Sequence, residues 1–242
     1  AFYDVAGFKA GQSSLKEIEL GLLGDIKGKS VLHLQCHFGQ DTISLSRLGA
    51  TTTGVDLSDK AIDVAQKLAE EVGSDSTFIC CDIYDLPTHL DREFDIVFTS
   101  YGTIGWLPDM DKWAKIVSKY LKPGGKFVFA EFHPFIWMYD DDFDSVAYSY
   151  FKDAPIIETN TGTYAEKGAD LVQQNITWNH SISEVVNSLI SNGLEIHVLN
   201  EYDYSPYNCL NHMVEISPGK HIIEKFGNKI PMVYTILATK KG

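Results

Sequence analysis

The feature that most constrains this chain is the regular alternation of short apolar segments with helical segments from residue 30 to about residue 132. β-Branched and aromatic residues gather in five segments that we predict as strands: 30–34, 51–55, 77–80, 94–99 and 126–132. Between them, apolar side chains recur every three or four positions in three predicted helices: 41–48, 59–72 and 110–121. Such alternation requires right-handed crossovers and therefore predicts a parallel sheet that is covered on both faces.

The regions on either side of this alternation are less regular but still fit one domain spanning residues 1–242. Residues 14–17 fit a capping box ahead of an apolar run, which predicts an N-terminal helical segment within residues 1–29. Residues 133–180 are too many for a simple connection, so we interpret them as an insertion that acts as a substrate lid. Within and after it we predict an added hairpin, a helix and two late strands, at 156–164 with 171–180, 181–192, 195–199 and 231–240.

The charge balance argues against two classes of partner. The 242 residues hold 20 Lys and Arg against 33 Asp and Glu, a net charge of −13. Proteins that grip phosphate backbones are normally basic. We therefore expect neither a nucleic acid nor an anionic membrane as a partner, and the sequence does not fix an oligomeric state.

Hydropathy and cysteine usage indicate the compartment. The longest uncharged apolar run, residues 230–239, is far shorter than the roughly 20 residues that span a bilayer, and no basic-then-apolar leader opens the chain. The adjacent pair Cys80 and Cys81 cannot easily bridge itself, so reduced thiols are the better interpretation. Cysteine and histidine spacing does not fit a zinc site. We expect a cytoplasmic protein with no metal site.

Polar residues follow several predicted strands, where an open parallel sheet binds its ligands. Residues 35–40 turn into a helix N-terminus, which attracts a negative group. Asp56 ends the second strand, where an acid can accept hydrogen bonds from both hydroxyls of a ribose. Asp82 follows the third strand, and Tyr101 with Gly102 follows the fourth. An acid after a strand is equally often a helix cap, so the ordered series carries the argument.

The segments VLHLQCHFGQ, TGVDLS, CCDI, FDIVFTSYG and LKPGGKFVFAEF resemble the class I S-adenosylmethionine-dependent methyltransferases over residues 13–132. The resemblance implies a doubly wound, mostly parallel, seven-stranded Rossmann-like sheet with an inserted β hairpin, residues 194 onward supplying the last two strands. It also implies transfer of the methyl group of S-adenosylmethionine to a small molecule.

The same resemblance assigns residues to the donor. In that family the glycine-rich turn passes the donor's methionine part, the acid after the second strand holds the ribose, and the aspartate after the third strand lies by the adenine. The segment after the fourth strand faces the transferred methyl group. The residues that match these places here are Gln35, Cys36, His37, Phe38, Gly39, Gln40, Asp56, Leu57, Ser58, Asp82, Ile83, Ser100, Tyr101 and Gly102.

The turn after the first strand departs from the family pattern. That pattern reads acid-x-Gly-x-Gly-x-Gly, whereas this chain has His33, Gln35 and His37 in the first three places and keeps only Gly39. Glycine there serves a tight turn and a close backbone approach, so larger side chains must either accept strain or fill space that the ligand would use. Gln35 or His37 then either contacts the amino-acid part of the donor or only caps the following helix.

Two other functions compete with methyl transfer on the same fold. A nicotinamide-dependent oxidoreductase needs G-x-G-x-x-G after the first strand, and Gln35, His37 and Gln40 stand where those glycines are required. A protein that binds S-adenosylmethionine or S-adenosylhomocysteine without transferring the methyl group is the stronger alternative, because the altered turn suits it.

Methyl transfer depends mainly on alignment and exclusion of water, so a general base is optional. Histidine is the side chain best suited to that role near neutral pH. His133 follows the fifth strand on the ligand side and is the first candidate, and His180 at the end of the insertion is the second. For either histidine, the alternative is a structural hydrogen bond.

Aromatic residues concentrate at the start of the insertion. Eight of the chain's 29 aromatic residues lie between 132 and 151: Phe132, Phe135, Trp137, Tyr139, Phe143, Tyr148, Tyr150 and Phe151. This density suits a lid over an apolar or planar acceptor, and it equally suits the packing of a small added sheet. Tyr3 and Phe8 either close over the donor or pack on the sheet edge.

Overall fold

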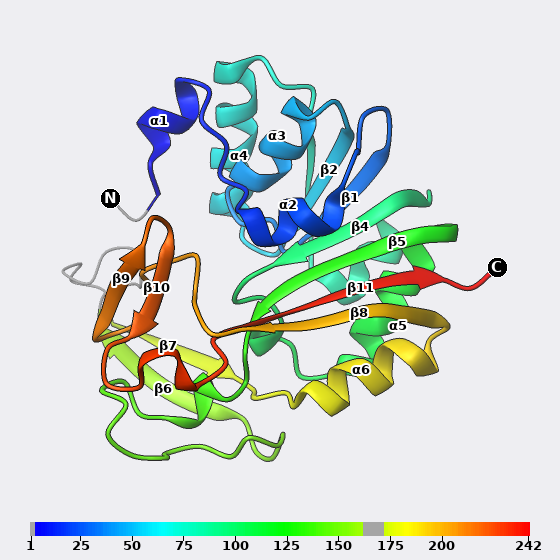
Figure 1. Cartoon of the computed structure of the whole chain (residues 1–242). Helices are drawn as coiled ribbons and strands as arrows, with labels where there is room; N and C mark the ends of the chain where they lie inside the picture. Colours follow the sequence, from blue (N-terminus) through cyan, green and yellow to red (C-terminus); the bar gives the residue numbers. More distant parts are fainter. Residues whose placement is uncertain (1–2, 162–171) are drawn as a thin grey trace.

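The fold is built on a seven-stranded sheet in the order β3-β2-β1-β4-β5-β11-β8 (Figure 1). The computed structural model describes residues 3–161 and 172–242. The first five strands are parallel, and β11 runs antiparallel to both of its neighbours. The strands are β1 (Ser30–Leu34), β2 (Thr51–Asp56), β3 (Thr77–Cys80), β4 (Phe94–Ser100), β5 (Leu121–Phe132), β8 (Leu194–Tyr202) and β11 (Val233–Lys240). This confirms the predicted doubly wound, mostly parallel sheet.

Helices cover both faces of the sheet, as the alternation predicted. One face packs against α2 (Glu17–Leu23) and α3 (Gln40–Arg47), which contribute Leu23 and Leu45 to a core with β1, β4 and β5. The helices α1 (Val5–Lys9) and α4 (Asp59–Val72) extend this layer through Phe8 and Leu68, which pack on Ile43 of α3. The other face packs against α5 (Met110–Tyr120) and α6 (Ile182–Ser191). Within the described residues, no helix combines the length and apolar character needed to cross a membrane.

The starts of the N-terminal helix and of β5 differ from the sequence prediction. The N-terminal helix begins at Glu17, where the Lys16 amide donates to the Glu19 carboxylate at 2.6 Å, so the capping box does not start at Ser14. Strand β5 begins at Leu121, which pairs with Phe94 before a register shift. Local propensity does not reveal either start, because tertiary contacts select among several possible first residues.

Two antiparallel hairpins extend beyond the end of the sheet to which β5 points (Figure 1). The first pairs β6 (Ile156–Thr161) with β7 (Val172–Thr177) and confirms the predicted insertion hairpin. The predicted parts at 162–164 and 171 lie outside the described residues. The second hairpin, β9 (Met213–Ser217) with β10 (Lys220–Ile223), was not predicted, although the Pro218-Gly219 dipeptide between two β-rich runs is a turn signal.

Candidate functional site

A cleft of about 1,580 Å³ lies at the carboxyl ends of the parallel strands. Every residue that the sequence assigned to the donor lines it, from the turn at 35–40 to Ser100–Gly102 after β4. Its other walls come from the N-terminal segment, the loops after β4 and β5, the β6–β7 hairpin and residues 207–211. The topology explains this convergence, because ligands in open α/β sheets bind where the strand order reverses.

The turn after β1 keeps a left-handed backbone without the glycines that usually allow it. Gln35 has φ 56° and His37 has φ 49°, while Gly39 has φ 81°. A non-glycine residue in this region stores roughly 1–3 kcal/mol of strain. Of the two outcomes expected from the sequence, strain is the one observed at these positions, and the cleft beside them stays open.

The side chains of the two substituted positions turn away from each other. The Gln35 Nε2 donates to the carbonyl of Thr103 at 2.8 Å, which ties the turn to the loop after β4. The His37 ring packs against the rings of Tyr3 and Phe38. The Gln35 Oε1 is buried and has no hydrogen-bond partner among the residues that the structure describes. A buried polar atom without a hydrogen-bond partner lowers the stability of the fold, so this acceptor is expected to bind a donor from a ligand.

Gly39 is the family glycine that packing makes indispensable. A Cβ at this position would lie 2.6 Å from the Phe78 ring and 2.9 Å from the Ala65 Cβ. These contacts are too short for any side chain, so only glycine lets α3 begin here against β3 and α4. The helix N-terminus that follows supplies the positive end of a dipole at the cleft.

The Asp56 carboxylate fixes the end of β2 to this turn. It accepts hydrogen bonds from the backbone amides of His37 at 2.7 Å and of Ser58 at 2.9 Å. A carboxylate offers about four lone-pair sites, so two backbone bonds leave capacity for hydroxyl donors. The adjacent Leu57 side chain is 70% exposed and projects beside it, and Ser58 caps α4 by accepting from the Ala61 amide.

Asp82 has the helix-cap role that the sequence left open. Its carboxylate accepts from the Tyr84 amide at 2.8 Å and caps the short 3-10 helix η1 (Ile83–Thr88). Ile83 is buried at the wall of the cleft. Capping does not remove Asp82 from the cleft, because it lines the cavity beside Ile83.

A buried glutamate at the end of β5 organises the loop after β4. The Glu131 carboxylate accepts from the amides of Gly102, Thr103 and Ile104 and from the Thr103 hydroxyl. It also accepts from the Phe132 amide. The sequence carries a signal for this role, since one acid interrupts an otherwise apolar strand and a buried acid needs donors.

Two acids, buried Glu19 and half-buried Asp41, attach the N-terminal segment to the cleft. The Tyr101 hydroxyl donates to Glu19 at 2.9 Å, and Tyr101 itself has a left-handed φ of 42°. Burial, with the nearby Asp41 charge, raises the pKa of Glu19 to about 7. Asp41 accepts from the Ser14 hydroxyl at 2.5 Å and from the Ser100 hydroxyl at 3.2 Å. Sequence reasoning missed Glu19 and Asp41 because their partners come from distant segments.

The structure places His133 outside the cleft, against the prediction that it is a general base. Its Nδ1 accepts from the Phe135 amide at 3.1 Å, so its Nε2 carries the hydrogen donated to Glu201 at 2.8 Å. The ring packs edge-on against Tyr234, and burial lowers its pKa. Both nitrogens are therefore engaged, Nδ1 by the segment that follows β5 and Nε2 by Glu201 of β8.

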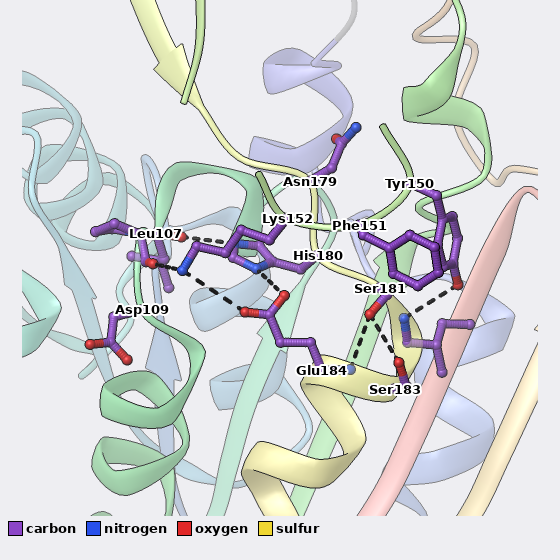
Figure 2. A network of polar contacts seen from close by, with 12 residues as sticks. Leu107, Asp109, Tyr150, Phe151, Lys152, Asn179, His180, Ser181, Ser183 and Glu184 are labelled. Carbon is purple, nitrogen blue, oxygen red and sulfur yellow. Dashed lines mark hydrogen bonds and ion pairs between the residues drawn. The ribbon is translucent and has the colours of Figure 1, made fainter. Parts of the chain in front are cut away.

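His180 lines the cleft, but both of its ring nitrogens also have partners (Figure 2). The Nε2 donates to the Leu107 carbonyl at 2.8 Å, and the Nδ1 lies 3.0 Å from the Glu184 carboxylate of α6. Lys152 lies between the same carboxylate and the Pro108 carbonyl. His180 thus holds the loop after β4 against α6, which is a positioning role and not that of a base.

The two N-terminal aromatic residues both line the cleft but pack against different parts of the chain. Phe8 is buried on Ile43 and Leu68, and the Arg47 guanidinium lies 4.2 Å from its ring centroid. Tyr3 contacts the rings of His37 and Phe38 at the mouth of the cleft. Phe8 therefore packs the helical layer, whereas Tyr3 covers the turn.

The strain at His37 predicts a reversed order of stability for two small residues. We expect His37→Gly to be more stable than His37→Ala by about 1 kcal/mol, because alanine keeps the left-handed penalty and glycine does not. Lys67, exposed within α4, is the matched control. There Lys67→Ala should be more stable than Lys67→Gly by about 1 kcal/mol. Urea unfolding measures both pairs, and the same order at both positions would refute strain at the turn.

Replacing Glu131 tests the hydrogen bonds that organise the loop after β4. We expect Glu131→Ala to lower the free energy of unfolding by roughly 3–5 kcal/mol, because buried amides lose a charged acceptor. Glu195→Ala, at an exposed position of β8, should change it by no more than about 0.5 kcal/mol. Urea denaturation measures the stability of both variants. Equal stabilities would show that the Glu131 hydrogen bonds do not stabilise the fold.

The raised pKa of Glu19 predicts a pH-dependent penalty. A carboxyl with a raised pKa binds its proton more tightly when folded, so its stabilising contribution is complete below the unfolded pKa and is lost as the pH rises through about 7. The loss is roughly 3 kcal/mol. Between about pH 5 and about pH 8, the free energy of unfolding of Glu19→Gln should therefore rise by about that much relative to that of the wild-type protein. Exposed Glu17→Gln is the control, and a pH-independent difference for Glu19→Gln contradicts the assignment.

Comparison with known proteins adds family evidence to this geometry. Residues 31–125 match a family model described as a methyltransferase domain. Over 105 residues the chain is 37% identical to the ubiquinone biosynthesis O-methyltransferase of Coxiella burnetii, covering 43% of this chain and 44% of that protein. It is 32% identical over 131 residues to an uncharacterised methyltransferase of Synechocystis, covering 53% and 59%. The chain thus spans about half the length of these relatives.

Solved structures extend the similarity of fold over nearly the whole chain. A candidate S-adenosylmethionine-dependent methyltransferase from Listeria monocytogenes has a TM-score of 0.65 at 20% identity, covering 98% of this chain and 100% of that one. A glycopeptide N-methyltransferase in complex with sinefungin has a TM-score of 0.61 at 18% identity, covering 96% and 89%. Residues 31–125 thus match a methyltransferase domain, and the seven-stranded fold of the whole chain is similar to that of these solved methyltransferase structures.

Proposed function

We propose that this protein transfers the methyl group of S-adenosylmethionine to a small-molecule acceptor. The observation that carries the proposal is one cleft that joins the turn after β1, Asp56 and the loop after β4 to the walls of the insertion. A pocket for one drug-sized ligand measures about 300–1,000 Å³. A cleft of about 1,580 Å³ therefore has room for a donor and an acceptor together.

The residues on the donor side fit the chemical groups of S-adenosylmethionine. Asp56 has lone pairs left for the ribose hydroxyls, and exposed Leu57 offers an apolar surface beside an adenine. Asp82 and Ile83 border the same place. The orphaned Gln35 Oε1 suits the donor's ammonium group, which would satisfy it.

The bound donor would supply a methyl group activated by its sulfonium charge. The chain would bind and orient both molecules, and the insertion at 133–180 would act as the lid that excludes water. The lid is supported by the many insertion residues that line the cleft, among them Trp137, Tyr139 and Tyr148. We assign no general base, because the ring nitrogens of His133 and His180 are already engaged.

A donor-binding protein without transferase activity is the second candidate function. The substituted turn and the engagement of both predicted bases favour it. A broad metabolite pool incubated with methyl-labelled donor separates the two: labelled product supports the enzyme, and binding without product supports the second candidate. We also keep the cytoplasm as the proposed location, which the four free cysteines support.

Asp56→Ala tests the donor site by calorimetry with S-adenosylmethionine and S-adenosylhomocysteine. The variant loses charge-assisted hydrogen bonds of roughly 1.5–3 kcal/mol, so both dissociation constants should rise about tenfold to a hundredfold. Exposed Asp59→Ala, which lies outside the cleft, is the control and should leave them unchanged.

Two results would count against this assignment. Unchanged affinity in Asp56→Ala would make Asp56 purely structural. If neither ligand gives a heat of binding with the wild-type protein at millimolar concentration, both candidate functions are refuted.

A further inference from the structure

Three of the four tryptophans of the chain line the cleft, all on the side of the insertion. Trp106 ends the 3-10 helix η2 (Ile104–Trp106), and Trp137 lies in the 3-10 helix η3 (Ile136–Met138). Trp178 directly follows β7. Trp106 is 50% exposed and Trp137 is 38% exposed, whereas the fourth, Trp113, is fully buried in the core. Large aromatic side chains gathered half-exposed in a cavity mark a binding surface and not a packing core.

Hydrogen bonds of the chain hold the three tryptophan segments together. The Trp178 amide donates to the Gly105 carbonyl at 2.8 Å, which joins the end of β7 to the segment that carries Trp106. The buried Asn179 donates to the carbonyls of Trp137 at 3.2 Å and of Ser149 at 2.8 Å. Figure 2 shows Asn179 pointing away from Glu184, on the opposite side from the His180 network. Asn179 and His180 therefore anchor the loops after β5 and after β4 from adjacent positions of one segment.

The β6–β7 hairpin adds a carboxylate to this wall. Alternate residues of a strand share one face, and Ile156 and Glu158 of β6 line the cleft together with Asn175 and Thr177 of β7. Glu158 pairs directly with Asn175 across the hairpin. The Tyr148 hydroxyl donates to Glu158 at 2.5 Å, and this bond raises the pKa of Tyr148 to about 12. Glu158 is the acceptor of this bond, and its side chain lines the cleft.

The charges of the cleft are strongly one-sided. Among the described residues that line it, eight are Asp or Glu and one, Lys16, is Lys or Arg. The Lys16 ammonium lies 4.8 Å from the centroid of the Tyr207 ring, beside the N-terminal segment. The insertion side holds three of the acids, namely Asp140, Asp141 and Glu158. An anionic acceptor would meet repulsion there, with no guanidinium or ammonium in the described part of that wall to bind it.

We propose that the tryptophan pocket, defined as Trp106, Trp137, Trp178 and Glu158, binds an acceptor that carries a positively charged amine on an apolar skeleton. Indole faces attract cations through the ring quadrupole, and a nearby carboxylate adds Coulomb attraction. This inference rests on the proposed function, because it names the acceptor class of the same cleft. It makes His180 and Asn179 positioning residues of the pocket, since each fixes a loop that carries a tryptophan.

Three probes with one skeleton and different charge test the pocket. Phenethylamine, 2-phenylethanol and phenylacetate are titrated calorimetrically into protein saturated with S-adenosylhomocysteine. We expect phenethylamine to bind tightest and phenylacetate weakest, with a ratio of dissociation constants of at least about tenfold. Phenylacetate binding as tightly as phenethylamine overturns the proposal, and so does the failure of all three probes to bind up to about 10 mM.

Matched variants locate the effect. Glu158→Gln keeps an acceptor for Tyr148 but removes the charge, so it should weaken phenethylamine about tenfold and leave 2-phenylethanol unchanged. Asp153→Asn, exposed and outside the cleft, is its control. Trp106→Leu should weaken phenethylamine at least about fivefold. Phe151→Leu, 66% exposed and outside the cleft, should not. Equal effects in variant and control overturn the assignment of that residue.

The acceptor class and the proposed function can be refuted separately. Unchanged affinity for S-adenosylhomocysteine in each variant shows that the fold and donor side are intact. If S-adenosylhomocysteine binds and the probes show no charge preference, the proposed function stands and the acceptor class is wrong. If S-adenosylhomocysteine does not bind to the wild-type protein, the proposed function fails, and the same probe series without it still decides the charge preference of the pocket.

Discussion

The hydrogen bonds between the Asp56 carboxylate and two backbone amides are the contacts on which the donor side of the cleft depends. They fix the turn after β1 to the end of β2, at His37 and Ser58. Gln35 and His37 hold left-handed conformations there without being glycine. Such strain persists only where the surrounding structure determines the backbone. The carboxylate, the Gln35 bond to Thr103 and the close packing of Gly39 together provide that determination.

The opposite wall depends on three carboxylates, those of buried Glu131 and Glu19 and of half-buried Asp41, which accept hydrogen bonds from the chain. Glu131 accepts hydrogen bonds from the amides of the loop after β4. Glu19 accepts from Tyr101 and Asp41 accepts from Ser100, which connects the N-terminal segment to the same loop. Burying a charge is tolerated when hydrogen bonds satisfy it. The consequence is a cleft whose walls are drawn from distant parts of the chain and whose interior is acidic. That acidity agrees with a cationic acceptor more than with a phosphorylated or carboxylated one.

The histidines show how a chemically apt residue is diverted by its surroundings. His133 and His180 both follow strands on the ligand side, which made them reasonable candidates for a base. In the fold, each ring bridges two structural elements and has both nitrogens engaged. Alignment of the reactants and exclusion of water are sufficient for much of the acceleration of methyl transfer. The architecture therefore assigns these histidines to holding the walls of the cleft in place.

The sequence by itself determined the parallel sheet, its helical layers and the strand-end positions that line the cleft, because hydrophobic period and strand-end residues are local properties of the chain. Only the tertiary structure decided which partners His133 has, how Glu131 and Glu19 find donors, and that Trp106, Trp137 and Trp178 line the same cleft. These depend on contacts between residues far apart in the chain, such as the bond from Asn179 to Trp137. No local pattern encodes such pairings, since the packing of the whole fold selects them.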